Sequence, residues 1–160
     1  MNILNDYTVS LSTIAIVPNC HPQYQTMIID LEGVFYFSDK PGSIISRSCL
    51  TYGASYDGRR DAAIYLANYI QKTPILISEA DGIIAIPTHS PDHDDCTWII
   101  LHHIKEIKPT TKSCCQIKFH NYSDLEVKSS SLTIRQQIQK AAVIYSIFCT
   151  KQKISYSFDR

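Results

Sequence analysis

Two adjacent arginines, Arg59 and Arg60, stand where an α-helix is expected to begin. Apolar residues follow at i, i+3, i+4 and i+7, the spacing of one helix face: Ala63, Leu66, Ala67 and Ile70. The backbone N–H groups of a first helical turn carry partial positive charge, so a cation there costs roughly 0.3–1 kcal/mol whereas an anion is favoured. The pair therefore indicates either a docking point for something anionic or two outward, solvated cations paired locally with Asp57 and Asp61.

Histidine and cysteine gather in a second group, in which H-x3-H-x2-C is followed by a His-His pair. His89, His93 and Cys96 are of the types that bind zinc, but the loop between them, SPDHDD, is acidic and lacks two pairs of closely spaced ligands. On a β-strand, His102 and His103 would point to opposite faces, so at most one could join. We predict no metal site, with zinc kept as the alternative.

Enzyme motifs are absent from the sequence, which contains no G-x-S-x-G, no Walker loop and no H-E-x-x-H. A cysteine–histidine pair stays open, because Cys49 or Cys96 could meet a histidine in space and spacing alone does not test that. We predict a protein that is not an enzyme, with no catalytic residue and no cofactor.

Composition indicates one soluble globular domain over residues 1–160, with 44% hydrophobic and 19% charged residues. No apolar stretch approaches the roughly 20 residues of a membrane span, and no signal peptide is visible. The six cysteines include no CxxC pair. We therefore expect a reduced, cytoplasmic protein, with Cys49 and Cys149 as small core residues.

Charge is zero overall but unevenly spread. Residues 40–72 and 101–118 each carry +3, whereas residues 1–39 and 73–100 carry −4 and −5. Any binding to nucleic acid must therefore rest on a local basic face rather than on long-range attraction. The residues that could form such a face, with interleaved tyrosines, are Arg47, Tyr52, Tyr56, Arg59, Arg60 and Lys72.

The elements that must position these residues are hairpins and two helices. Turn signals separate three pairs of strands: 26–31 and 34–37, 74–78 and 83–87, 116–119 and 125–128. Further strands are expected at 13–18, 43–49 and 97–107. The class is therefore α+β, with a mainly antiparallel hairpin-built sheet and two helices, near 58–71 and 132–150.

Each predicted helix has a start signal. Ser55 or Asp57 is the expected N-cap of the first, and Ser131 that of the second. One apolar stripe of the second helix is expected in the core: Ile134, Ile138, Ala141, Ala142, Tyr145, Phe148 and Cys149. Its other side carries Arg135, Gln136, Gln139 and Lys140.

Several motifs together resemble the competence transcription factor family, ComK. They are TIAIVP, VFYFSDKP, SRSC, YGASYDGRRDA, KTPILIS, IPT, CTWI and HIKEIKP, in family order and spacing. The resemblance runs from about Tyr7 to about Pro109 and more loosely through the last helix. The stretch from Gly53 to Arg59 is its most specific piece.

What this resemblance implies is a bacterial, cytoplasmic, nucleoid-associated activator of late competence genes. Family members bind paired A/T-rich boxes in double-stranded DNA, chiefly through the minor groove, as dimers or higher homo-oligomers. RNA polymerase and an adaptor for a Clp protease are implied partners. No membrane contact is expected.

The resemblance also implies a set of DNA-binding residues. Arg47, Arg59 and Arg60 are the expected groove residues, because a narrow A-tract groove concentrates negative potential and attracts arginine. Three lysines are expected on phosphates, which position a protein without reading sequence: Lys72, Lys105 and Lys108. The same DNA-binding segment contains Ser55, Tyr56 and Gly58.

The chain departs from the family pattern at its end, which follows the last helix closely where longer members continue. We expect this chain to differ in the contacts that longer members make through their C-terminal extension, including those for oligomerisation or activation. The alternative function is a divergent regulator that acts by protein–protein interaction with a ComK-like partner, without activating by itself.

Overall fold

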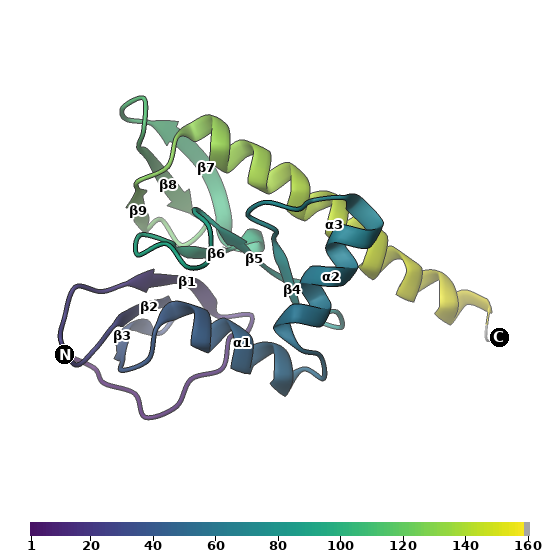
Figure 1. Cartoon of the computed structure of the whole chain (residues 1–160), viewed down its shortest axis with the longest axis horizontal. Helices are drawn as coiled ribbons and strands as arrows, with labels where there is room; N and C mark the ends of the chain where they lie inside the picture. Colours follow the sequence, from purple (N-terminus) through teal and green to yellow (C-terminus); the bar gives the residue numbers. More distant parts are fainter. Residues whose placement is uncertain (159–160) are drawn as a thin grey trace.

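The computed structural model describes the backbone of residues 1–158 and the side chains of residues 1–149. Within them lie a six-stranded sheet, ordered β3-β2-β1-β6-β5-β4, and a three-stranded sheet, β7-β8-β9, in which neighbouring strands are antiparallel (Figure 1). The strands are β1 Thr13–Pro18, β2 Thr26–Asp30, β3 Gly33–Phe37, β4 Ile75–Ser78, β5 Ile83–Pro87, β6 Trp98–Ile100, β7 Ile104–Pro109, β8 Cys115–Phe119 and β9 Asp124–Val127. The helices are α1 Pro41–Thr51, α2 Tyr56–Ala67 and α3 Ser131–Phe158.

The six-stranded sheet is the middle layer, because its two faces pack against different elements. One face meets α1, in a core that joins Ile75, Ile77 and Ile83 to Ile44 and Ile45. The opposite face is covered by the small sheet and α3. One cluster on this face includes Ile14, Ile99, Ile117, Phe119 and Ile134, and the other includes Leu76, Ile84, Ala141 and Ile144.

Helix α2 lies beside the edge strand β4 and packs against the hydrophobic cores on both faces of the sheet. Tyr56 at its start packs on the core shared with α1, whereas Ala63 packs with Leu76 and with Ile144 of α3. An edge strand exposes unpaired backbone groups unless another element covers it. The position of α2 thus protects β4 and brings the helix next to α3.

The predicted α+β class is confirmed, as are the three hairpins. The turns at Gly33 and Gly82 have φ of 139° and 67°, a backbone region that glycine enters without the steric cost of a Cβ. Cys49 and Cys149 are buried, as predicted. No helix in the described part of the chain is both long and apolar enough to cross a bilayer.

The strand predicted at 43–49 is wrong, since these residues form the middle of a third helix, α1. Pro41 stands at the beginning of this helix, where its missing N–H costs nothing, and Lys40 is the N-cap. The buried residues Ile44, Ile45, Ser48 and Cys49 recur with helical spacing. The Lys40-Pro41-Gly42 triplet is therefore a helix start and not the turn before a strand.

The single strand predicted at 97–107 is also wrong, because the chain changes sheets within it. Strand β6 ends at Ile100, a 3-10 turn covers Leu101–His103, and β7 begins the small sheet. The Nε2 atoms of His102 and His103 lie 3.1 and 2.7 Å from the same carbonyl oxygen, that of Leu11. The two rings do not point to opposite faces, because a 3-10 turn does not alternate its side chains as a strand does.

Helix α2 begins earlier and ends earlier than the prediction of 58–71. Asn68, with φ of 59°, closes it in the left-handed conformation common at helix ends. Of the predicted apolar face only Ala63 is buried, while Leu66 and Ile70 are 42% and 59% exposed. The early start also moves Arg60 into the second turn, where the helix dipole matters less.

Helix α3 extends beyond the predicted 132–150, and its N-cap is one residue earlier than predicted. The Ser130 Oγ accepts the N–H of Thr133 at 3.2 Å. The buried stripe includes Gln137 and Ile144, whereas Ala142 and Tyr145 are exposed. The stripe shifts because α3 packs first on the small sheet and then on α2 and the β4–β5 hairpin.

Candidate nucleic-acid interface

The start of α2 is built by three of the predicted DNA-binding residues. The Oγ of Ser55 accepts the N–H of Gly58 at 2.9 Å, which makes Ser55 the N-cap as predicted. A Cβ at position 58 would lie 2.9 Å from that same oxygen, so a larger residue there would require a small shift of the Ser55 side chain. Tyr56 packs edge-on against Trp98, and burial raises the pKa of its hydroxyl to about 12. All three therefore fix the helix start, and DNA contact by them stays a prediction.

Arg59 points inward. Its side chain is 16% exposed, and its Nη1 lies 3.4 Å from Oε1 of Glu79, just beyond β4. Its Nε is buried with no acceptor among the described residues. The guanidinium also lowers the pKa of the Cys49 thiol, although burial is the larger effect and raises that pKa to about 11. The environment is that of an internal ion pair.

Arg60 behaves differently from its neighbour. It is half-buried, and its Nη2 donates to the carbonyl oxygen of Ile70 at 3.2 Å. In the described part of the chain no carboxylate pairs with Arg60. The interpretation that both arginines are outward and paired with Asp57 and Asp61 is thus wrong.

Arg47 lies on α1, on the far face of the sheet from α3. Its Nη2 is 2.9 Å from Oδ2 of Asp39, and its guanidinium lies over the ring of Phe37, 5.3 Å from the centroid. Both members of the ion pair are more than 40% exposed. An exposed pair of this kind is worth about 0–1 kcal/mol, so Arg47 can exchange Asp39 for a phosphate at little cost.

The three predicted lysines separate into two places. Lys72 lies on the segment that leads from α2 to β4, with its backbone at φ of 47° and its carbonyl oxygen 2.6 Å from Nε2 of Gln137. Lys105 and Lys108 are exposed on β7 in the small sheet, where the Lys105 ammonium lies over the Tyr122 ring. The structure thus brings Arg60 against the segment that carries Lys72, because Arg60 binds the carbonyl oxygen of Ile70, and leaves Arg47, Lys105 and Lys108 on other layers.

Lys140 of α3 joins Arg60 and Lys72, although its sequence position indicated only a solvated helix face. Its Nζ donates to the carbonyl oxygen of Gln71 at 3.1 Å and lies over the ring of Tyr69, 5.7 Å from the centroid. Burial, and then the charge of Lys72, lower the pKa of Lys140. In the sequence, Lys140 lies three positions after Gln137, and residues at this spacing share a helix face. This spacing was the signal that Lys140 lies on the same side of α3 as Gln137.

Comparison with known proteins gives the family. The model of the ComK protein family matches residues 4–153. The competence transcription factor of Bacillus subtilis (strain 168) is 31% identical over 146 residues, which cover 91% of this chain and 76% of that protein. The chain belongs to the ComK family. No solved structure gives a significant match.

ComK is a family of transcription factors, so the prediction that the chain is not an enzyme is confirmed. The thiols considered for catalysis have an environment that agrees with this. Cys49 and Cys96 are both buried, and burial raises the pKa of each thiol away from the reactive thiolate range.

The histidine group contains no metal site among the described residues, where no three His, Cys, Asp or Glu side chains could hold an ion. The rings of His89 and His93 stack with centroids 4.7 Å apart. The Cys96 thiol instead donates to the carbonyl oxygen of His89. The Nδ1 atoms of His89 and His93 also have partners, since they lie 2.8 Å from the Thr88 hydroxyl and 3.0 Å from the Asp95 N–H, respectively.

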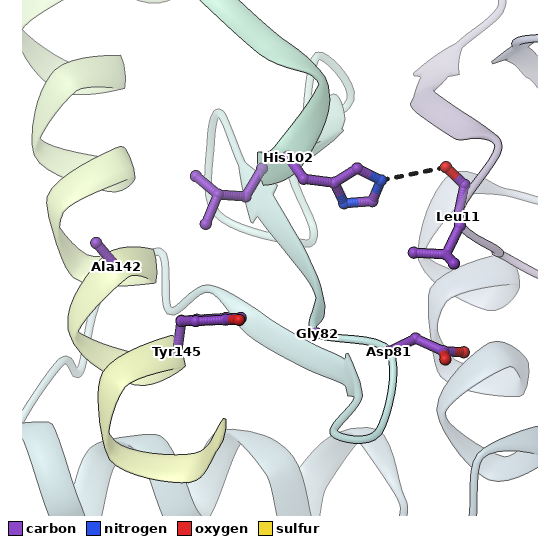
Figure 2. Close-up of a pocket in the computed structure, with 7 residues that line it drawn as sticks. Leu11, Asp81, Gly82, His102, Ala142 and Tyr145 are labelled. Atoms are coloured by element: carbon purple, nitrogen blue, oxygen red, sulfur yellow. Dashed lines mark hydrogen bonds between the residues drawn. The ribbon is translucent and has the colours of Figure 1, made fainter. Parts of the chain in front are cut away.

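An apolar groove of about 360 Å³ lies between α3, the β4–β5 turn and the 3-10 turn (Figure 2). Figure 2 shows the ring of Tyr145 reaching across the groove toward Gly82, and the ring of His102 directed at the carbonyl oxygen of Leu11. The lining residues are Leu11, Asp81, Gly82, Leu101, His102, Ala142 and Tyr145. The predicted DNA-binding residues are not among them, so the groove is separate from the candidate interface.

Proposed function

We propose that this ComK-family protein activates competence genes by binding paired A/T-rich boxes, largely through the minor groove. The observation that carries the proposal is the match to the B. subtilis competence transcription factor over 91% of this chain. The family match includes the start of α2 with both arginines. A neutral protein can bind DNA in this way, because groove-inserted arginine uses the local potential of A-tracts.

Arg60 is the groove residue that the geometry favours, with Arg47 as the second. Arg60 is held by a hydrogen bond to a backbone carbonyl, and Arg47 by an exposed ion pair and its position over the Phe37 ring. The largely buried Arg59 has a charged partner in Glu79 and would have to break that pair to reach a groove. We therefore propose that Arg59 acts by fixing the start of α2, from which Arg60 extends.

The lysines provide backbone contacts in this proposal. Lys72 lies beside Arg60 and contacts phosphates that flank the groove, whereas Lys105 and Lys108 on the small sheet contact phosphates farther along the duplex. Phosphate contacts contribute affinity and salt dependence without sequence information.

Paired boxes further suggest that the protein binds as a dimer or a larger homo-oligomer, since DNA sites with two-fold symmetry are normally bound by proteins with two-fold symmetry. RNA polymerase is the partner that an activator needs, and an adaptor for a Clp protease is the proposed controlling partner. The proposed location is the cytoplasm, on the nucleoid.

The test is a gel shift with a paired A/T-box duplex and a G·C-substituted control across a salt series. We expect binding to the A/T duplex that weakens with salt, and weaker binding to the control. Sedimentation at saturation should give two or more protomers for each duplex. Equal affinity for both duplexes, or no binding to either, would overturn the proposal.

One observation favours the alternative of a regulator that acts through a protein partner. The end of α2 and the residues after it expose Tyr65, Leu66 and Ile70, at 87%, 42% and 59%. Neighbouring exposed apolar side chains are typical of interaction surfaces. Co-purification with a ComK-like partner, without any shift of the A/T duplex, would support this second function instead.

A further inference from the structure

Residues 70–72, here termed the crossing segment, join α2 and α3 through three consecutive backbone carbonyl groups. Each carbonyl oxygen accepts a side-chain donor from one of the two helices. The bonds are Arg60 Nη2 to Ile70 at 3.2 Å, Lys140 Nζ to Gln71 at 3.1 Å, and Gln137 Nε2 to Lys72 at 2.6 Å. In Figure 1 this segment runs between α2 and α3. Cationic side chains from two helices are thereby gathered around one short stretch of chain.

The backbone at Lys72 is left-handed, with φ of 47°. This conformation is unfavourable for a residue with a Cβ, so something must hold it. Gln137 does so, since it is 1% exposed and its Nε2 also donates to the carbonyl oxygen of Pro87 at 2.9 Å. A single buried amide group thus fixes the backbone of Lys72 to the end of β5.

The cations at the crossing segment have no carboxylate partner. The ion pairs among the described side chains are Arg47 with Asp39, Arg59 with Glu79 and Lys128 with Asp95, so Arg60, Lys72 and Lys140 take part in none. The Lys140 ammonium group binds the carbonyl oxygen of Gln71, the residue before Lys72, and its pKa is lowered first by burial and then by the charge of Lys72. Like charges held together without an acid repel each other, and a bound anion relieves that repulsion.

We infer that Lys72 and Lys140 clamp one phosphodiester of the DNA backbone beside the groove entered by Arg60, and that Gln137 is the residue that positions the clamp. The inference rests on the proposed function, and adds Lys140 as a contact and Gln137 as a positioning residue. A phosphodiester fits because it brings one negative charge and two free oxygens to two ammonium groups, one of them already held by its helix and both on neighbouring elements.

The first test compares Lys72→Asn and Lys140→Gln with a matched control, Lys112→Gln. Asparagine tolerates the left-handed backbone, so Lys72→Asn removes the charge and keeps the segment. Lys112 is exposed on the β7–β8 loop, away from the crossing segment. Each clamp variant should lower affinity for the A/T duplex about fivefold at 0.15 M salt and reduce the salt slope by about 0.9, whereas the control should change neither.

The second test follows the Lys140 ammonium group by NMR. Its pKa should rise in Lys72→Asn, because the neighbouring charge is gone, and also in Gln137→Met, because Lys72 is no longer held beside it. If Gln137 stabilises the fold without holding Lys72 beside Lys140, the pKa of Lys140 should be unchanged in Gln137→Met. The Lys140 signal should shift on adding A/T duplex and not on adding inorganic phosphate at equal ionic strength.

The outcomes separate the clamp from the proposed function. If Lys72→Asn and Lys140→Gln bind DNA like the wild type while Arg60→Ala binds weakly, the clamp is refuted and the function stands. If inorganic phosphate shifts the Lys140 signal and DNA does not, the site takes a free anion and the clamp is again refuted. If the wild-type protein binds no DNA, both are refuted. Should Gln137→Met not fold, the two lysine variants decide the clamp without it.

Discussion

Replacing Arg59 and Arg60 one at a time by alanine should have opposite consequences. Arg59 is 16% exposed and its Nη1 lies 3.4 Å from Glu79, while Arg60 donates to the carbonyl oxygen of Ile70 and has no carboxylate partner among the described residues. At that distance two unit charges attract by about 1 kcal/mol in water and about 5 kcal/mol at an effective dielectric constant of 20. Desolvation opposes much of this attraction.

We therefore expect Arg59→Ala to lower the free energy of unfolding by about 2 kcal/mol, as the Glu79 carboxylate loses its partner and the arginine stem its packing. In a chain of this size that corresponds to about 4–8 °C in Tm. Arg60→Ala should change stability by no more than about 0.5 kcal/mol, because a half-buried cation without an acid partner is lost. Its effect should fall on DNA, with weaker binding and poorer discrimination against G·C boxes.

Urea unfolding followed by circular dichroism gives both free energies, and a Glu79→Gln variant completes a double-mutant cycle with Arg59→Ala. The cycle should give a coupling of about 1–2 kcal/mol between Arg59 and Glu79. The reasoning is refuted if Arg59→Ala is as stable as the wild type, or if Arg60→Ala binds A/T boxes with unchanged affinity and salt dependence.

Three further substitutions test other parts of the fold. Ser55→Ala removes the oxygen that accepts the Gly58 N–H and should cost about 1 kcal/mol in urea unfolding, whereas an unchanged midpoint would contradict the cap assignment. Ile138→Asp puts a charge where α3 packs on both of its core clusters and should cost at least about 3 kcal/mol, so a cooperative wild-type-like melt would contradict that packing. Burial lowers the pKa of His103 in the folded protein below its value near 6.5 in the unfolded chain. The neutral ring therefore contributes fully to the free energy of unfolding above about pH 6.5, and this contribution is lost as the pH falls toward the pKa of the folded protein. In His103→Gln, thermal melts between pH 7 and 5 should show a smaller loss than in the wild type, and an equal loss would exclude His103 as a cause.

Local signals explain why the sequence predicted some elements correctly. The hairpin turns at Gly33 and Gly82 and the Ser55 cap are each determined by residues within a few positions of one another. The third helix was missed for an equally local reason, because Lys40-Pro41-Gly42 is compatible with a turn and with a helix start. Only the packing of Ile44 and Ile45 on the sheet decides between them.

The features that the sequence did not predict depend on distant partners. Arg59 is turned inward by Glu79, twenty positions away, and Lys140 joins the interface through Gln71, sixty-nine positions away. The change of sheet after Ile100 depends on β6 pairing with β1 and β5 while β7 pairs with β8. Periodicity carries no information about such pairings, so a continuous strand was the natural but wrong prediction.

The seam between β1 and β6 has a consequence for how the protein reaches its fold. Strands β1–β3 form one meander and β4–β6 another, and the two join through Ala15 with Ile99 and Ile16 with Trp98, over a separation of about 80 residues. Closing so long a loop costs conformational entropy before any contact repays it, and such non-local pairings make folding slow. On the ribosome, the first meander must therefore wait with an open edge until β6 has been synthesised, and this interval is when the chain is most exposed to wrong strand pairing.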